Sequence, residues 1–143
     1  MADLDSLIRL RRHRVEEKQK ILAEIFRHVE AIEYRKKELL SRLEKERKAL
    51  DENLNIETRA YYGRFEGVIR GDIERMNAEL KKLEVRVQIA QDEVREAFAD
   101  MKRIEIVNDR RKEEEAQEIK KKESTELDEI GIDGFRRQDK NQT

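Results

Sequence analysis

One apolar heptad pattern constrains the fold of this chain more than any other feature. Apolar residues recur at alternating steps of four and three, with no polar interruption, at Ile69, Ile73, Met76, Leu80, Leu83, Val87, Ala90, Val94, Ala97, Met101 and Ile104. This spacing places the side chains on one stripe of an α-helix, which is the seam of a coiled coil. A single stripe is buried only when another helix covers it. The sequence therefore predicts a partner helix.

The first half of the chain supplies a matching stripe. Its apolar members are Ile8, Val15, Leu22, Ile25, Val29, Ile32, Leu39, Leu43 and Leu50. This seam is less regular, because charged or amide side chains occupy core positions at Arg11, Lys18, Lys36, Glu46 and Asn53. Such residues lower stability but fix the register of a coiled coil. The two stripes can pair within one chain, as a helical hairpin, or between chains, as a dimer.

A change of heptad phase separates the two halves. The step from Leu50 to the position extrapolated back from Ile73, at Glu66, is 16 residues, or two heptads plus two residues. Coiled coils tolerate insertions of three or four residues, so this shift favours a true break. Turn and capping residues lie in the same stretch at Asn53, Asn55, Thr58 and Gly63.

The predicted fold is all-α: two long helices in an antiparallel coiled-coil hairpin, with both termini at one end. We expect residues 1–143 to form a single helical-hairpin domain. Its parts are a first helix over about 4–54, a turn over about 55–63, a second helix over about 64–123 and an acidic-apolar tail over 124–143.

Two registers bring the two seams together. The first places Leu22 on Ala97 and Val29 on Ala90, and this register is preferred. The second places Val29 on Leu83, but it brings the acids Glu46 and Glu66 against each other.

Composition narrows the class of protein. The 143 residues include no Pro and no Cys, and 47% of them are charged. Uninterrupted helix requires the absence of proline, and without cysteine neither disulfides nor thiolate metal sites can form. No apolar run approaches the ~20 residues of a membrane span, and the N-terminus lacks a signal-peptide core. These features predict a soluble cytoplasmic protein without membrane insertion.

Charge and motifs argue against an enzyme. The net charge is -1, so no global field attracts nucleic acid. His13 and His28 are 15 residues apart and cannot form a metal pair on one helical face. No phosphate-binding loop, nucleophile elbow or paired catalytic constellation is present, and 36% apolar residues on two stripes cannot enclose an active site. We expect no catalytic residues, no metal and no cofactor.

The arginine cluster is the one dense basic run, and it comprises Arg9, Arg11, Arg12 and Arg14. A solvated helical face balanced by nearby acids is its default interpretation. A docking role is the alternative, since the cluster lies at the predicted terminal end of the hairpin. Nucleic-acid binding ranks third, because no aromatic stacking platform accompanies the arginines.

An aromatic cluster lies beside the predicted turn and comprises Tyr61, Tyr62 and Phe65. Only Tyr62 falls on the seam. The cluster can close the hairpin as a hydrophobic plug, or it can form an exposed patch for a partner, since aromatic residues are favoured interface anchors.

Both ends of the chain resemble a known family. The start of the chain looks like the N-terminus of FliJ-type flagellar export proteins. The residues that carry this resemblance are Leu4, Asp5, Ser6, Leu7, Ile8, Arg9, Leu10 and Arg11, followed by Val15, Glu17, Lys18, Gln19, Leu22, Ala23 and Glu24. The injectisome relatives of this family are the YscO-type stalk proteins. The end of the chain is similar to the acidic-apolar closing motif of that family. This closing run is Glu126, Leu127, Asp128, Glu129, Ile130, Gly131, Ile132, Asp133, Gly134, Phe135, Arg136 and Arg137. Gly131 and Gly134 depart from its more helical tail.

The resemblance implies a non-enzymatic stalk of a flagellar or type III export apparatus, at the base of the flagellum. Such a stalk inserts the end with both termini into the hexameric export ATPase, regulates that ATPase, and contacts the export gate protein and export chaperones. On this basis two groups of residues are expected to face the ATPase: the arginine cluster, and the C-terminal residues Leu127, Asp128, Glu129, Ile130 and Phe135. The aromatic cluster is expected to face the export gate protein or a chaperone. A generic dimeric coiled-coil scaffold or tether is the alternative function.

Overall fold

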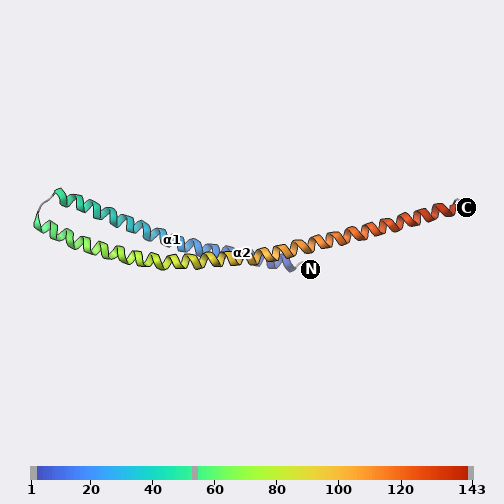
Figure 1. Cartoon of the computed structure of the whole chain (residues 1–143), viewed down its shortest axis with the longest axis horizontal. Helices are drawn as coiled ribbons and strands as arrows, with labels where there is room; N and C mark the ends of the chain where they lie inside the picture. Colours follow the sequence, from blue (N-terminus) through green and yellow to red (C-terminus); the bar gives the residue numbers. More distant parts are fainter. Residues whose placement is uncertain (1–2, 53–54, 142–143) are drawn as a thin grey trace. The chain divides into compact units, whose positions relative to one another are not determined.

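Two long α-helices make up the fold. The computed structural model describes residues 3–52 and 55–141, in which α1 spans Asp3–Glu52 and α2 spans Ile56–Asn141 (Figure 1). The helices pack against each other as an antiparallel hairpin, which confirms the predicted fold class. Contacts divide the chain into unit 1, which is Met1–Arg12 with Ala99–Thr143, and unit 2, which is His13–Phe98.

The start of α2 is set by a local cap. The backbone N–H of Glu57 donates to the Asn55 side-chain oxygen at 3.1 Å, and Arg59 N–H donates to the Asn55 carbonyl at 3.1 Å. Asn55 is thus the N-cap of α2, a position that favours asparagine. The predicted turn over about 55–63 was therefore too long, since these residues are mostly the first turns of α2. The predicted seam position Asn53 lies outside the described residues.

The end of α2 also differs from the prediction. The second helix was expected to stop at about residue 123, but it continues to Asn141 and includes Gly131 and Gly134. Neither glycine has a positive φ. Glycine costs only about 1 kcal/mol relative to alanine in a helix, and no proline is present to interrupt the backbone hydrogen bonds. Two glycines among good helix formers therefore do not end the helix.

The core of unit 2 is the predicted seam. Its buried centre comprises Ile25, Ile32, Leu83 and Ala90, and Leu83 is only 3% exposed. Partly buried side chains pack around this centre from both helices, namely Leu22, Val29, Met76, Leu80 and Val87. No apolar residue of either predicted stripe is exposed, so the heptad analysis identified the core correctly.

The preferred register was wrong, and the alternative matches the structure. The core cluster joins Leu22 and Val29 of α1 to the stretch of α2 from Met76 to Ala90, whereas the preferred register needed Leu22 opposite Ala97. Ion pairs across the helices agree, because Lys18 Nζ lies 3.1 Å from a carboxylate oxygen of Glu93.

Charges along the edge of the seam explain this choice. Lys18 pairs with Glu93 at 3.1 Å, and His28 Nε2 lies 3.5 Å from a Glu79 carboxylate oxygen. The alternative register was disfavoured because it brings Glu46 and Glu66 together. Their electrostatic repulsion is small, since Glu46 is exposed and Glu66 binds Arg70 of its own helix at 2.7 Å. Solvent screening and a local counter-charge remove most of the repulsion.

In unit 1 the first turns of α1 pack on α2. Ile8 and Met101 are buried, and Asn108 donates a side-chain hydrogen bond to Asp5 at 3.3 Å. Asp109 and Lys112 still line a shallow depression together with Asp5 and Arg9 of α1, and α2 then continues to Asn141 (Figure 1). Both chain ends therefore lie in unit 1, but α2 extends well past the start of α1.

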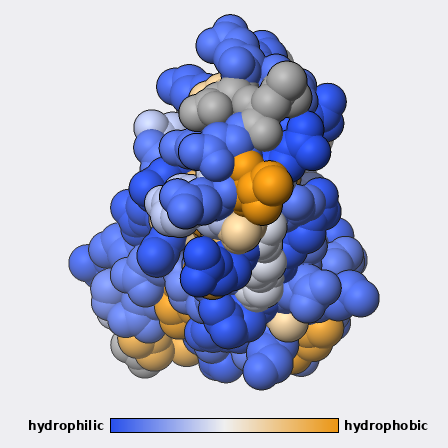
Figure 2. All heavy atoms as spheres, turned by 90° about the vertical axis from the view of Figure 1, so that its left-hand side faces the viewer, coloured by the Kyte–Doolittle hydropathy of each residue, from blue (hydrophilic) through white to orange (hydrophobic). Residues whose placement is uncertain are grey.

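The surface beside the helix connection is mostly hydrophilic. Figure 2 shows this end with hydrophobic groups only in isolated places. Within the described part of the chain, no helix is both long and apolar enough to cross a membrane.

Candidate functional site

The C-terminal extension, residues 109–141 of α2, is a helix whose residues 109–140 are not buried by any other described part of the chain. Every residue from 109 to 140 is exposed. An isolated helix gains no stability from tertiary packing, so its stability rests on backbone hydrogen bonds and local side-chain pairs. This extension is the largest surface of unit 1 that the fold itself does not use.

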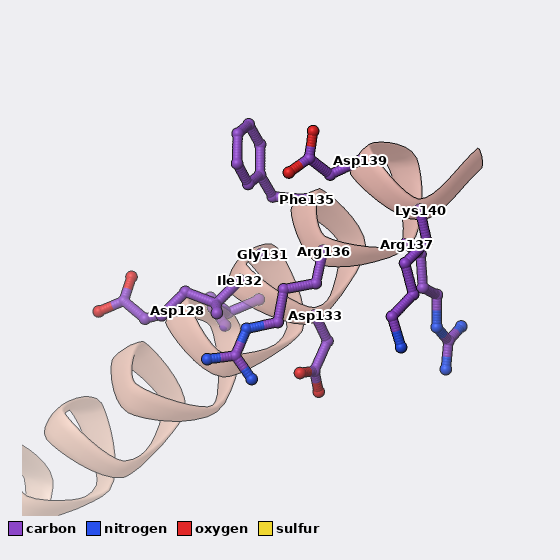
Figure 3. A pocket seen from close by; sticks show the side chains of 10 residues that line it. Asp128, Gly131, Ile132, Asp133, Phe135, Arg136, Arg137, Asp139 and Lys140 are labelled. Atoms are coloured by element: carbon purple, nitrogen blue, oxygen red, sulfur yellow. The ribbon is translucent and has the colours of Figure 1, made fainter. Parts of the chain in front are cut away.

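Large apolar side chains cluster near the end of the extension. Leu127 is 68% exposed, Ile130 67%, Ile132 54% and Phe135 71%. They follow one another within about two turns of helix, and in Figure 3 Phe135 projects away from the helix axis. Exposed apolar groups concentrated in this way mark an interaction surface more often than isolated ones do.

The apolar groups do not enclose a cavity. The depression around Leu127, Gly131 and Phe135 is lined by residues of this one helix and is open to solvent (Figure 3). An added Cβ at Gly131 would meet nothing within 4 Å. The surface can therefore accept a helix or groove of a partner, but it cannot sequester a small substrate from water.

The arginine cluster divides by orientation. Arg9 and Arg14 are exposed. A terminal nitrogen of Arg12 lies 3.2 Å from Glu105 of α2, so this side chain ties the two helices together. Arg11 points into the seam, and its buried Nε has no hydrogen-bond partner among the described residues. These contacts give Arg11 and Arg12 a place in the helix pair. Arg9 and Arg14 take part in none of these contacts.

Glu105 is the centre of the polar contacts at this position. Its carboxylate accepts hydrogen bonds from Lys102 at 3.1 Å and from Arg12 at 3.2 Å. The hydrogen bond from Lys102, followed by that from Arg12, lowers the pKa of Glu105 below its ordinary value. Sequence reasoning missed this residue, although its position at the seam edge opposite the arginines could have identified it.

The aromatic cluster forms a short stack on unit 2. The rings of Tyr61 and Phe65 are 6.3 Å apart and nearly parallel, at 14°, and the Arg42 guanidinium lies 5.4 Å from the Phe65 centroid. Tyr61 is 60% exposed, whereas Tyr62 and Phe65 are half-buried. Phe65 thus lies against the Arg42 side chain of α1, whereas Tyr61 is exposed, and both interpretations of the cluster stay predictions. Arg42, which spacing alone did not single out, belongs to this stack.

The two histidines and the acidic residues of the described part of the chain form no metal-binding cluster. The described residues contain no group of three or more His, Cys, Asp or Glu side chains that could hold a metal ion. His13 pairs with Glu17 and His28 with Glu79, each at a seam edge or on the surface.

Comparison with known proteins identifies the family. The family model for the flagellar FliJ protein matches residues 1–140. The chain belongs to the FliJ family. The FliJ family is non-enzymatic, and membership makes this FliJ-type chain a component of the flagellar export apparatus, with partners in that apparatus. Searches of curated proteins and of solved structures each found no significant match.

The predicted site residues of this FliJ-type chain form separate surfaces. Arg12 lies beside Glu105, whereas Leu127 lies roughly 30 Å further along α2, at ~1.5 Å per residue. Asp128, Glu129, Ile130 and Phe135 are exposed on the same extension. The partner-binding roles of the arginine cluster, the aromatic cluster and the extension stay predictions.

Proposed function

We propose that the chain is a non-enzymatic stalk that inserts into the pore of the hexameric export ATPase and promotes its activity. The extension enters the ring first, and the exposed arginines of α1 meet acidic groups near the entrance of the pore. The stalk works at the base of the flagellum.

The continuation of α2 past the start of α1 is the observation that carries this proposal. A ring pore admits one helix more easily than a globular domain, and residues 109–140 are exposed on all sides. Mixed charges on such a helix allow contacts with several nonequivalent subunits without locking to one of them, since exposed ion pairs are individually weak. The paired helices behind the extension give the stiffness needed to transmit asymmetry to a ring.

We assign the aromatic cluster to a second partner, the export gate protein or an export chaperone. The exposed ring of Tyr61, supported by Phe65 and Arg42, suits an interface anchor.

Charge reversal of the exposed arginines tests the ATPase contact. Arg9→Glu combined with Arg14→Glu should weaken ATPase stimulation by the full-length chain about tenfold, because like charges would meet at the pore. Arg12 is left intact because it binds Glu105 across the helices. The measurement is the rate of ATP hydrolysis by the purified export ATPase at increasing chain concentration, at low and moderate salt.

Arg27→Glu combined with Lys48→Glu is the matched control. It makes the same charge change at exposed positions of α1 away from the arginine cluster. Circular dichroism should show equal helicity in both variants. If the Arg9 and Arg14 variant stimulates the ATPase like the wild type at both salt concentrations, the arginines have no part in the mechanism.

A further inference from the structure

The last four turns of the extension have two faces of different character. Successive residues of an α-helix are separated by about 100°, so residues 126–140 can be placed around its axis. An apolar arc covers roughly 200° of the helix. Its apolar and glycine positions are Leu127, Ile130, Gly131, Ile132, Gly134 and Phe135, and the polar residues Asp128, Gln138 and Asp139 lie among them. A charged arc covers the rest and comprises Glu126, Glu129, Asp133, Arg136, Arg137 and Lys140.

Charges are sorted unequally between the two arcs. The charged arc holds acids and bases in equal number and is close to neutral. The apolar arc contains Asp128 and Asp139 and no basic residue. In Figure 3, Phe135 and Asp139 point to one side of the helix, whereas Asp133 and Arg137 point to the other. The face that carries the apolar groups is therefore also the acidic face.

We propose that the apolar arc docks into a groove of another export-apparatus protein, and that this groove has an apolar floor and a rim of Lys or Arg side chains. An amphipathic helix that lays its apolar face into a groove is a common mode of recognition. Phe135 and Leu127 fill the floor, Gly131 lets the backbone approach, and Asp128 and Asp139 pair with the basic rim. This inference rests on the role in flagellar export and does not require that the partner be the ATPase.

Charge disfavours a second copy of the chain as the occupant. When two apolar arcs pack antiparallel, Asp128 of one copy approaches Asp139 of the other on the same edge. Like charges at a desolvated interface cost affinity. The same acids also disfavour nucleic acid or an anionic membrane.

The docking role of the apolar arc can be tested by measuring how fast cells that produce full-length variants spread by swimming. In a strain without its own copy of the gene, Asp128→Lys combined with Asp139→Lys should slow the spread of swimming cells about tenfold, because the rim would repel the helix. Glu126→Lys combined with Asp133→Lys is the matched control, with the same charge change on the charged arc, and should spread like the wild type. Phe135→Ser should reproduce the loss, whereas Ile119→Ser, at an exposed position outside the segment, should not. Immunoblots and circular dichroism check that all variants are made and helical.

Each outcome decides the inference. Acidic replacements of a Lys or Arg in a partner gene that restore swimming to the Asp128 and Asp139 variant would identify the groove. If that variant swims normally, or if the control loses swimming equally, the arc is not a docking face. If sedimentation shows a dimer of the wild type that Phe135→Ser abolishes, the occupant is a second copy and the basic groove is wrong. Failure of the chain to stimulate the ATPase would reject the stalk proposal alone, because swimming reports on the arc whichever partner is involved.

Discussion

Individual seam residues show how the helix pair accommodates charge. Arg11 and Lys36 occupy core positions and are half-buried, in a seam that also contains Met76 and Met101. Methionine is flexible and adapts to irregular neighbours, while the aliphatic stem of an Arg or Lys can pack against it. Flexible methionines in the seam can therefore adapt to charged side chains at core positions.

Replacing Arg11 should stabilise the protein. Its Nε is buried without a hydrogen-bond partner among the described residues, which costs free energy. Arg11→Leu should raise the free energy of unfolding by about 1 kcal/mol, whereas Arg9→Leu, at an exposed position, should change it by less than about 0.5 kcal/mol. Urea unfolding followed by circular dichroism measures both. A loss of stability in Arg11→Leu would mean that the guanidinium makes a favourable contact in solution.

Glu105 should make stability depend on acid pH. Because the folded state lowers the pKa of this carboxyl, its contribution is present above the ordinary pKa and is lost as pH falls through the lowered folded value. Glu105→Gln should therefore lower the melting temperature at neutral pH, and the difference from the wild type should shrink in acid. Melting curves at several pH values between about 7 and 3 test this. Glu114→Gln, on the extension, should follow the wild type throughout.

At the scale of the helices, the sequence predicted the pairing but not its details. Uninterrupted heptads identify which residues are buried, because a 3.5-residue repeat leaves only one face for a partner. The register was missed because core residues of similar size fit both registers, and weak edge contacts such as His28 with Glu79 decide between them. The end of α2 was missed because Gly131 was given too much weight against the helix formers around it. The sequence identified residues 127–135 as a candidate partner-binding segment. It could not divide this segment into an apolar arc and a charged arc, because that division requires the tail to be helical.

Disulfide formation tests the register directly. Val29→Cys combined with Leu83→Cys should close an intramolecular bridge, since the Lys18–Glu93 ion pair agrees with the register that places these residues opposite each other, and the natural chain has no cysteine to compete. Val29→Cys combined with Ala90→Cys should close more slowly and in lower yield. Non-reducing gels and mass spectrometry distinguish the bridged monomer from a dimer. Bridges that form only between chains would contradict the hairpin.

For the molecule as a whole, burial is distributed very unevenly along α2. Leu83 is 3% exposed, whereas every residue from 109 to 140 is exposed. Local stability follows the density of buried apolar contacts, so the same helix should open at very different free energies along its length.

Hydrogen exchange should reveal this gradient. Backbone amides around Leu83 should be protected by the full unfolding free energy, while those of residues 109–141 should exchange orders of magnitude faster. Mass spectrometry of peptides from the full-length chain after brief labelling measures both. Equal protection in the two regions would show that something covers the extension in solution, and repeating the measurement at lower chain concentration would show whether it is another copy.

The absence of packing around the extension has a mechanical consequence. A force applied near Phe135 is carried by one helix, whereas a force applied at Ile8 or Met101 is shared by two helices joined through their side chains. A single helix bends and twists more readily than a pair, because nothing but its own hydrogen bonds opposes the deformation. If a partner grips the tip, the extension acts as a compliant link between that partner and the stiffer hairpin.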